Sequence, residues 1–385
     1  MTKLPIMKKI RCFILILLIV LVISAFFASL GYNFLKENEV TSEFYFGVSY
    51  GQNSFEEAKI LIDKVKNYTN LFIINSYPIT TNYTSPQILN QICDYATQSD
   101  LHFIVYFFSF LAGDWQQDWV DFAQNRWGEK FLGVYLRDEP GGRQIEEREP
   151  VENASSYEDA AKSYVKTISS YFSNQFLNNK NIPIFVSDFA LYYYDYLAGF
   201  DTVFAEFGWN NSRTREVGLC RGAADILGKE WGAIITWTYM HPPYIGNGEE
   251  VFQDFLTAYN AGAKYVVLFD YPQYPEDNQY GILTNEHFVA MKQFWEYTLA
   301  NPSEAEDVNN RVAYIIPNYY GWGMRHLEDK IWGIWNPDEK SSIIWNNPIK
   351  LENKYGLRLD IIYDDPSTEG NRKYYQTYYW NSTIY

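Results

Sequence analysis

The sequence predicts an α/β protein built on a (β/α)8 barrel. Eight short apolar runs lie between residues 44 and 302, and each is followed by a stretch of helical character. The runs are continuously apolar, as expected of parallel strands buried on both faces. The segment also has the size of such a barrel, typically about 250 residues. The alternative, a doubly wound open sheet, generally shows a Gly-rich phosphate loop after its first strand, and residues 49–52 (Ser-Tyr-Gly-Gln) form no such motif.

The first 43 residues differ from the rest of the chain. Residues 12–32 are uncharged and mostly apolar, and about 20 such residues suffice to cross a bilayer. Basic residues within 1–11 favour a cytoplasmic N-terminus and an outward-facing chain. We therefore expect a cytoplasmic N-terminus (1–11), a single-pass transmembrane anchor (12–32) and a linker (33–43). The alternative is a cleaved signal peptide, because small residues near position 28 would suit a peptidase.

An outward-facing chain agrees with two further features. Five Asn-X-Ser/Thr sequons, at Asn67, Asn82, Asn153, Asn210 and Asn381, are candidate glycan acceptors. The formal net charge of −16 argues against a nucleic-acid partner, because binding to phosphates requires Lys and Arg. We therefore expect a protein of the outer face of the cell membrane, with no nucleic acid among its partners.

Eight strands and several helices are predicted within the barrel (44–302). The strands are 44–49, 71–76, 103–108, 132–136, 183–187, 202–206, 232–237 and 265–270. Helix candidates between them include 54–70, 85–99, 157–176 and 248–261, several of which open with a Ser or Asp suited to a helix N-cap.

A small C-terminal α/β domain (303–385) is predicted after a polar linker. Its expected strands are 312–316, 359–363 and 374–380, with a helix inside 339–355. Residues 317–337 form a long loop rich in Gly, Trp and Tyr, and loops of this length are commonly functional or packing elements. We expect this loop to pack against the barrel rather than to contact a ligand.

Polar and aromatic residues gather where the predicted strands end, which in a parallel barrel is a single mouth. Sugar rings stack on aromatic rings, and their hydroxyls bind amides and carboxylates. The chain contains 12 Trp and 34 Tyr, so we predict a carbohydrate substrate or ligand, although such residues can also simply pack a core. The predicted substrate-binding residues are Tyr50, Asn75, Tyr77, Arg137, Trp209, Trp237, Tyr239 and Tyr271.

Glycoside hydrolysis needs two carboxyl groups at the scissile bond. Side chains alternate between the barrel interior and the helix-facing exterior along a strand, so Glu139 is expected to share the interior with Tyr135 and Arg137. The same alternation places Asp138 outside, as an orienting or structural residue. Glu139 is therefore the predicted catalytic acid/base, and an ion pair of Glu139 with Arg137 or Arg143 is the alternative.

Three acidic residues are candidates for the second carboxylate. Glu206 is preferred, because it ends the sixth strand beside Trp209. Asp270 comes next and Asp188 third. Each of them could instead fasten a loop by accepting hydrogen bonds from backbone N–H groups.

Residues 133–140 (Gly-Val-Tyr-Leu-Arg-Asp-Glu-Pro) resemble the fourth-strand signature of clan-A-like TIM-barrel glycoside hydrolases, in which Asn-Glu-Pro supplies the acid/base Glu. The resemblance implies that role for Glu139. Asp138 replaces the family's Asn, which puts in doubt a hydrogen bond to the substrate 2-hydroxyl. Residues 234–239 hold no carboxylate where that clan places its nucleophile. Either another strand supplies the nucleophile, or the enzyme inverts, or the site is inactive.

Other chemistries lack their motifs. The four His residues are far apart and have no Cys partners, so we predict no metal site and no cofactor. Cys93 and Cys220 are expected to be buried free thiols. The sequence thus predicts a membrane-anchored extracellular protein similar to glycoside hydrolases, with paired carboxylates acting on glycans. The alternative is an inactive barrel that serves as a glycan-binding or cell-envelope module.

Overall fold

A computed structural model describes residues 44–81, 86–107, 114–172, 182–272, 280–302, 308–371 and 373–384. The predicted anchor (12–32) and the segments that flank it lie outside these residues. Within the described part of the chain, no helix combines the length and apolar character needed to cross a bilayer.

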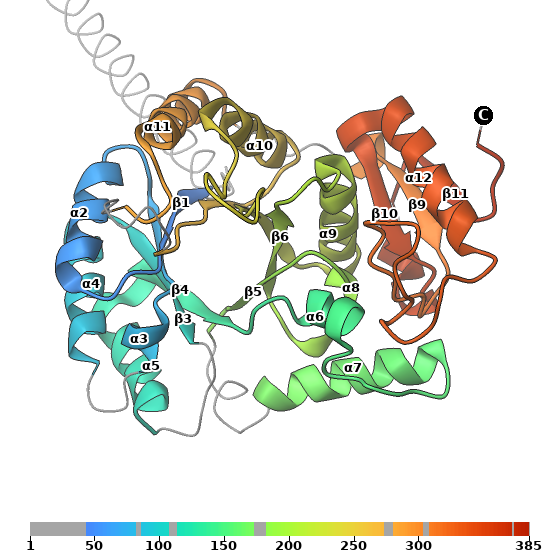
Figure 1. The fold of residues 1–385 in the computed structure, drawn as a ribbon, viewed down its shortest axis with the longest axis horizontal. Helices are drawn as coiled ribbons and strands as arrows, with labels where there is room; N and C mark the ends of the chain where they lie inside the picture. Colours follow the sequence, from blue (N-terminus) through green and yellow to red (C-terminus); the bar gives the residue numbers. More distant parts are fainter. Residues whose placement is uncertain are drawn as a thin grey trace, which may run out of the picture. The chain divides into compact units, whose positions relative to one another are not determined.

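Eight parallel strands close into a barrel, as the sequence predicts (Figure 1). Each strand pairs with the next along the chain, and the first pairs with the last. The strands are β1 (Tyr45–Tyr50), β2 (Leu71–Ile74), β3 (His102–Phe107), β4 (Phe131–Leu136), β5 (Ile184–Asp188), β6 (Thr202–Phe207), β7 (Glu230–Ile235) and β8 (Tyr265–Leu268).

Helices surround the barrel on its outer face (Figure 1). Capping boxes, in which side chain and backbone satisfy each other's free N–H groups, begin the helices that follow Ser54 and Asn247. The helices are α2 (Phe55–Val65), α3 (Tyr77–Thr80), α4 (Gln87–Gln98), α5 (Asp114–Trp127), η1 (Gly128–Lys130), α6 (Pro140–Glu147), α7 (Tyr157–Phe172), α8 (Tyr192–Ala198), α9 (Arg213–Leu227), α10 (Gly248–Asn260) and α11 (Asn285–Ala300).

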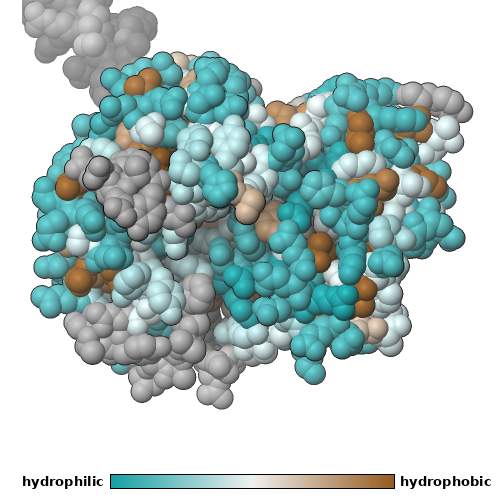
Figure 2. All heavy atoms as spheres, in the orientation of Figure 1, coloured by the Kyte–Doolittle hydropathy of each residue, from teal (hydrophilic) through white to brown (hydrophobic). Residues whose placement is uncertain are grey.

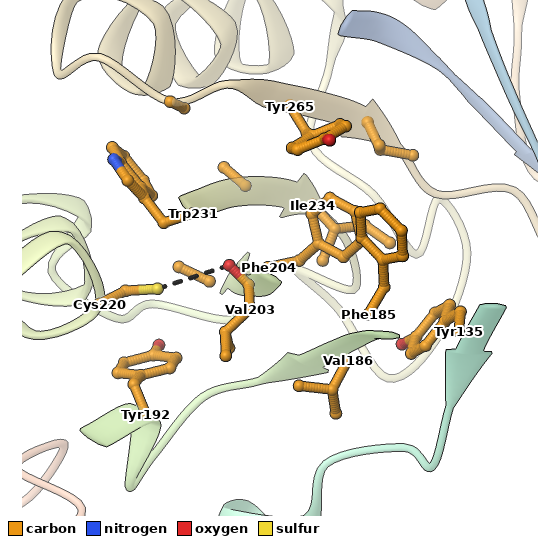
Figure 3. Close-up of a cluster of buried hydrophobic side chains, with 14 of the residues drawn as sticks. Tyr135, Phe185, Val186, Tyr192, Val203, Phe204, Cys220, Trp231, Ile234 and Tyr265 are labelled. Atoms are coloured by element: carbon orange, nitrogen blue, oxygen red, sulfur yellow. Dashed lines mark hydrogen bonds between the residues drawn. The ribbon is translucent and has the colours of Figure 1, made fainter. Parts of the chain in front are cut away.

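Aromatic rings fill the barrel interior. Phe185 of β5 contacts Tyr265 of β8 at a centroid distance of 5.4 Å, although these two strands are not neighbours in the barrel. The two rings can meet only across the barrel axis. Phe204 stacks on Phe185 at 5.7 Å (Figure 3). Tyr45 stacks on Tyr265 at 5.0 Å. Part of the high aromatic content is therefore accounted for by the core rather than by a ligand site.

A three-stranded parallel sheet follows the barrel and packs beside α9 (Figure 1). Its strands lie in the order β10, β9, β11. A Cβ on Gly218 of α9 would lie 2.8 Å from the carbonyl oxygen of Leu359, so glycine allows the close approach of helix and sheet. The elements are η2 (Val308–Asn310), β9 (Val312–Ile316), α12 (Ser341–Tyr355), η3 (Gly356–Arg358), β10 (Leu359–Tyr363), η4 (Pro366–Asn371) and β11 (Gln376–Tyr379).

A buried ion cluster joins the barrel to this sheet. Asp360 of β10 is fully buried and pairs with Arg221 of α9 at 2.8 Å and with Arg311 at 3.0 Å. Arg311 also pairs with Asp225 of α9 at 2.5 Å. Buried charges are tolerated only when they are paired, so the cluster fixes the C-terminal sheet against α9.

Candidate active site

Glu139 lies just beyond the end of β4, where the strand alternation stops. Arg137 and Glu139 both have left-handed backbone conformations, with φ of 65° and 48°. Pro140 then opens α6, a position at which its missing N–H costs nothing. The backbone N–H of Glu139 donates to the carbonyl oxygen of Ser187 at 3.2 Å, which ties this turn to β5.

Asp188 holds the start of α6. Its carboxylate accepts hydrogen bonds from the N–H groups of Gly141 at 2.5 Å and Gly142 at 2.8 Å. It also accepts from Phe189 and Ala190, and it is completely buried. Burial raises the pKa of Asp188 to about 7. Asp188, the third candidate for a catalytic carboxylate, thus fastens the N-terminus of α6 and supports Glu139, which precedes this helix.

Glu206 lies next to Glu139 at the end of β6. The two carboxyl groups are close enough for each to shift the pKa of the other. Oε1 of Glu206 also accepts from the Ser187 hydroxyl at 2.5 Å, and Ser187 in turn accepts from the Tyr135 hydroxyl at 2.6 Å. The structure therefore brings together the two acidic residues that the sequence ranked first, and it adds a Tyr-Ser chain behind them.

Burial makes this acidic pair retain a proton. Desolvation raises the pKa of Glu206 well above its usual range, and the negative charge of Glu139 adds to the effect. Desolvation also raises the pKa of Glu139, with a further contribution from Asp138. Two carboxyl groups in contact cannot both ionise readily. The pair therefore holds a single proton over a range of pH in which isolated Glu side chains would be ionised.

Asp138 and Arg137 do not follow the predicted alternation. The guanidinium of Arg137 stacks on the Tyr171 ring of α7 at 3.6 Å, so it points toward the helix layer rather than into the barrel mouth. Asp138 is exposed and acts electrostatically on Tyr106 and Tyr135 on the interior side. The left-handed conformation of Arg137 reverses the expected sides of these two residues. Partial desolvation raises the pKa of Asp138.

Glu139 lines a cleft of about 1060 Å³ at the barrel mouth. Trp209, which is 41 % exposed, lines it beside Glu139. The more deeply buried Glu206 is not among the lining residues and lies behind Glu139. The cleft is also lined by Ile145, Glu146, Phe189, Asn210, Asn211, Ser212, Arg215, Glu216, Thr238, Met324, Arg325, His326, Asp329, Lys330 and Trp345.

One wall of the cleft comes from the long C-terminal loop. The loop packs against the barrel, as predicted, and the side chain of Gln144 donates to the carbonyl oxygen of Trp332. The sequence did not indicate that Met324, Arg325, His326 and Lys330 would line the same cleft as Glu139. The length of the loop was a signal of function. Its Gly and Trp content gave no indication of which of its residues would reach the barrel mouth.

Two predicted site residues perform structural roles. Tyr50 lies on the outer face of β1, where it is fully buried, stacks on Phe72 and donates its hydroxyl proton to the carbonyl oxygen of Ser54. Asp270 is also fully buried, and its Oδ1 accepts from the N–H of Ile282 at 3.0 Å. Asp270 therefore anchors a segment that follows β8. The sequence placed both residues at strand ends but did not determine what their side chains would contact.

The remaining predicted residues lie near the mouth but outside the cleft of Glu139. Trp237 and Tyr271 follow β7 and β8, and their rings lie 6.1 Å apart. Tyr239 is 43 % exposed and Tyr271 is 39 % exposed. Asn75 follows β2 and donates its N–H to the carbonyl oxygen of Tyr50. The exposed Tyr77 begins α3.

No metal site is found among the described residues, in which no three His, Cys, Asp or Glu side chains are grouped to hold an ion. Cys93 and Cys220 are buried free thiols, as the sequence predicts.

Comparisons with known proteins concern the fold. No family model and no curated protein sequence matches the chain. Solved structures with similar barrels include the endo-β-1,4-mannanase of Thermotoga petrophila (12 % identity, 71 % of this chain and 82 % of that one, TM-score 0.44). Another is α-L-fucosidase isoenzyme 2 of Paenibacillus thiaminolyticus (9 % identity, 84 % of this chain and 59 % of that one, TM-score 0.49). A third is a 3-hexulose-6-phosphate synthase (14 % identity, 66 % of this chain and 99 % of that one, TM-score 0.35). Glycoside hydrolases are thus among the chains with a similar fold.

Proposed function

We propose that this protein is a glycoside hydrolase in which Glu139 is the general acid/base. The observation that carries the proposal is the close pair of Glu139 and Glu206 at the ends of β4 and β6, of which Glu139 lines the cleft. Glycoside hydrolysis requires one protonated and one ionised carboxyl group. A pair that holds one proton supplies both forms at the same time.

The positions of the two groups assign their parts in the reaction. Glu139 faces the cleft and can donate its proton to the leaving oxygen. Glu206 lies behind it and is oriented by the Ser187 hydroxyl. Retaining enzymes hold their carboxyl groups about 5 to 5.5 Å apart and inverting enzymes about 6.5 to 9.5 Å apart. The separation of the Glu139 and Glu206 carboxyl groups in a complex with a glycan would therefore distinguish the two mechanisms.

The shared proton predicts a bell-shaped pH dependence of kcat/KM. At low pH both carboxyl groups are protonated and the ionised partner is lost, whereas at high pH both are ionised and the acid is lost. Both pKa values are raised, so the optimum should lie above the ordinary range of Glu, which is about 4.3 in model peptides. The Glu206→Gln variant lacks the negatively charged partner, so the acidic limb of its kcat/KM pH profile should shift or disappear. An unchanged profile in Glu206→Gln would show that Glu206 takes no part.

A direct test is an activity screen of the full chain against a panel of polysaccharides and chromogenic glycosides. We expect the release of sugar from at least one member. If members of the panel bind but none is cleaved, the alternative function holds, namely a non-catalytic glycan-binding or cell-envelope module. The exposed Trp209 at the cleft and the exposed Tyr239 and Tyr271 outside it suit either function, because aromatic faces bind sugars with or without catalysis.

We further propose that the protein is anchored by residues 12–32 with its barrel outside the cell. The support is the uncharged apolar run after a basic N-terminal segment, together with the five sequons. Protease digestion of intact and permeabilised cells tests this topology. Protection of the barrel in intact cells would contradict it.

A further inference from the structure

The C-terminal loop is held firmly at the barrel mouth by contacts with the helix that follows Glu139. Arg325 pairs with Glu146 of α6 at 2.6 Å. Gln144 of α6 donates its side-chain N–H to the carbonyl oxygen of Trp332 at 2.8 Å. The loop and α6 are therefore connected by both charged and neutral hydrogen bonds.

A second set of contacts fixes the same loop to α9. Nη1 of Arg215 donates to the carbonyl oxygen of Met324 at 3.0 Å, while its Nε pairs with Glu352 of α12 at 2.7 Å. Within the loop, Oδ2 of Asp329 accepts from the N–H groups of Arg325 at 2.9 Å and His326 at 3.1 Å. The wall is thus preorganised, which lowers the entropic cost of binding a ligand.

The barrel and the C-terminal loop contribute different chemistry to the cleft. The barrel contributes Trp209, with Asn210 and Asn211 next to it, whereas the loop contributes the exposed side chains of His326 and Lys330. An aromatic ring and polar donors in one cleft suit a sugar ring, which has an apolar face and a rim of hydroxyls. At about 1060 Å³ the cleft is slightly larger than ordinary ligand pockets, which range from about 300 to 1,000 Å³. It offers more room than one ring at Glu139 would need.

We propose that residues 324–330, together with Trp209, form a binding site for the distal units of an oligosaccharide whose scissile bond lies at Glu139. The preferred substrate is then a chain of several sugars rather than a single glycoside. This inference rests on the proposed hydrolytic function. It extends that function by assigning specificity for chain length to the C-terminal loop.

The test uses 4-nitrophenyl glycosides that carry one to five units of glucose, mannose, xylose or N-acetylglucosamine. In the full chain, the combined change of His326→Ala and Lys330→Ala should raise KM increasingly with chain length, by about tenfold for the longest glycosides. Lys373→Ala removes an exposed lysine of the C-terminal part that does not line the cleft. Lys373→Ala should leave KM unchanged for glycosides of every chain length.

Binding of the same series to the Glu139→Gln variant, followed by Trp fluorescence, gives a readout without hydrolysis. Tighter binding of longer chains, lost on the combined change of His326 and Lys330, supports the site. The proposed site would be overturned if the combined change left the affinity unaltered or lowered it equally at every chain length. It would also be overturned if no member of the series bound. Hydrolysis by the unchanged chain without a length-dependent effect would overturn this inference alone, whereas length-dependent binding without hydrolysis would overturn the proposed function alone.

Discussion

Replacing Glu139 by Gln is expected to reduce the hydrolysis of any accepted glycan by about 10²- to 10⁴-fold, the usual contribution of a general acid or base. Gln keeps the size of the side chain and its hydrogen-bonding capacity but cannot donate a proton to a leaving oxygen. The binding of the glycan should change only a few-fold, because the cleft walls remain. Steady-state kinetics and equilibrium titration on the same protein measure both effects.

The matched control is Glu129→Gln. Glu129 is an exposed residue of η1, at the opposite end of β4 from Glu139. The change should leave both hydrolysis and binding intact. Full activity of Glu139→Gln would exclude Glu139 as the acid/base.

Replacing Asp360 by Ala is expected to lower the free energy of unfolding by about 3 to 5 kcal/mol, the range for breaking a buried ion pair. Arg221 and Arg311 would keep their charges in a buried place without their shared carboxylate. Because this cluster joins the C-terminal sheet to α9, the cleft wall formed by the C-terminal loop should be loosened as well. Denaturant unfolding of the full chain measures the change in stability.

Asp100→Ala provides the comparison for the buried cluster. The Asp100 side chain is 94 % exposed and pairs with Lys130 at 2.6 Å. Exposed pairs contribute little to stability, because solvent screens their charges. A loss on changing Asp360 that is no greater than the loss on changing Asp100 would mean that the cluster does not hold the C-terminal sheet.

The barrel could be predicted from the sequence because its physical signal is local. Continuous apolar runs and capped amphipathic helices recur along the chain, and each of these features can be recognised without knowledge of its neighbours. The proximity of Glu139 and Glu206 could also be predicted, because the strands of a parallel barrel all end at the same mouth. Their mutual contact and the support from Ser187 depend on side-chain positions that no local pattern determines.

The failures of prediction came from places where local regularity ends. The prediction extended the side-chain alternation of β4 through Arg137. The left-handed backbone of Arg137 ends this alternation and reverses which side of the barrel wall the next side chains face. Tyr50 was assigned to the mouth although its position on β1 faces the helices. Asp270 takes the alternative role that the sequence offered, because it fastens the chain after β8 by accepting from a backbone N–H. The wall at Arg325 depends on contacts between residues about 180 positions apart. Periodicity in the sequence carries no information about contacts of that kind.

We propose that Glu139 and Glu206 share one proton at the barrel mouth. Infrared difference spectroscopy of the full chain against Glu206→Gln tests it without a substrate, because a protonated carboxyl has a C=O stretch distinct from that of a carboxylate. At neutral pH, we expect the unchanged chain to show a protonated-carboxyl band that is absent from both Glu206→Gln and Glu139→Gln. A difference spectrum that contains only carboxylate bands would show that both groups are ionised and would contradict the shared proton.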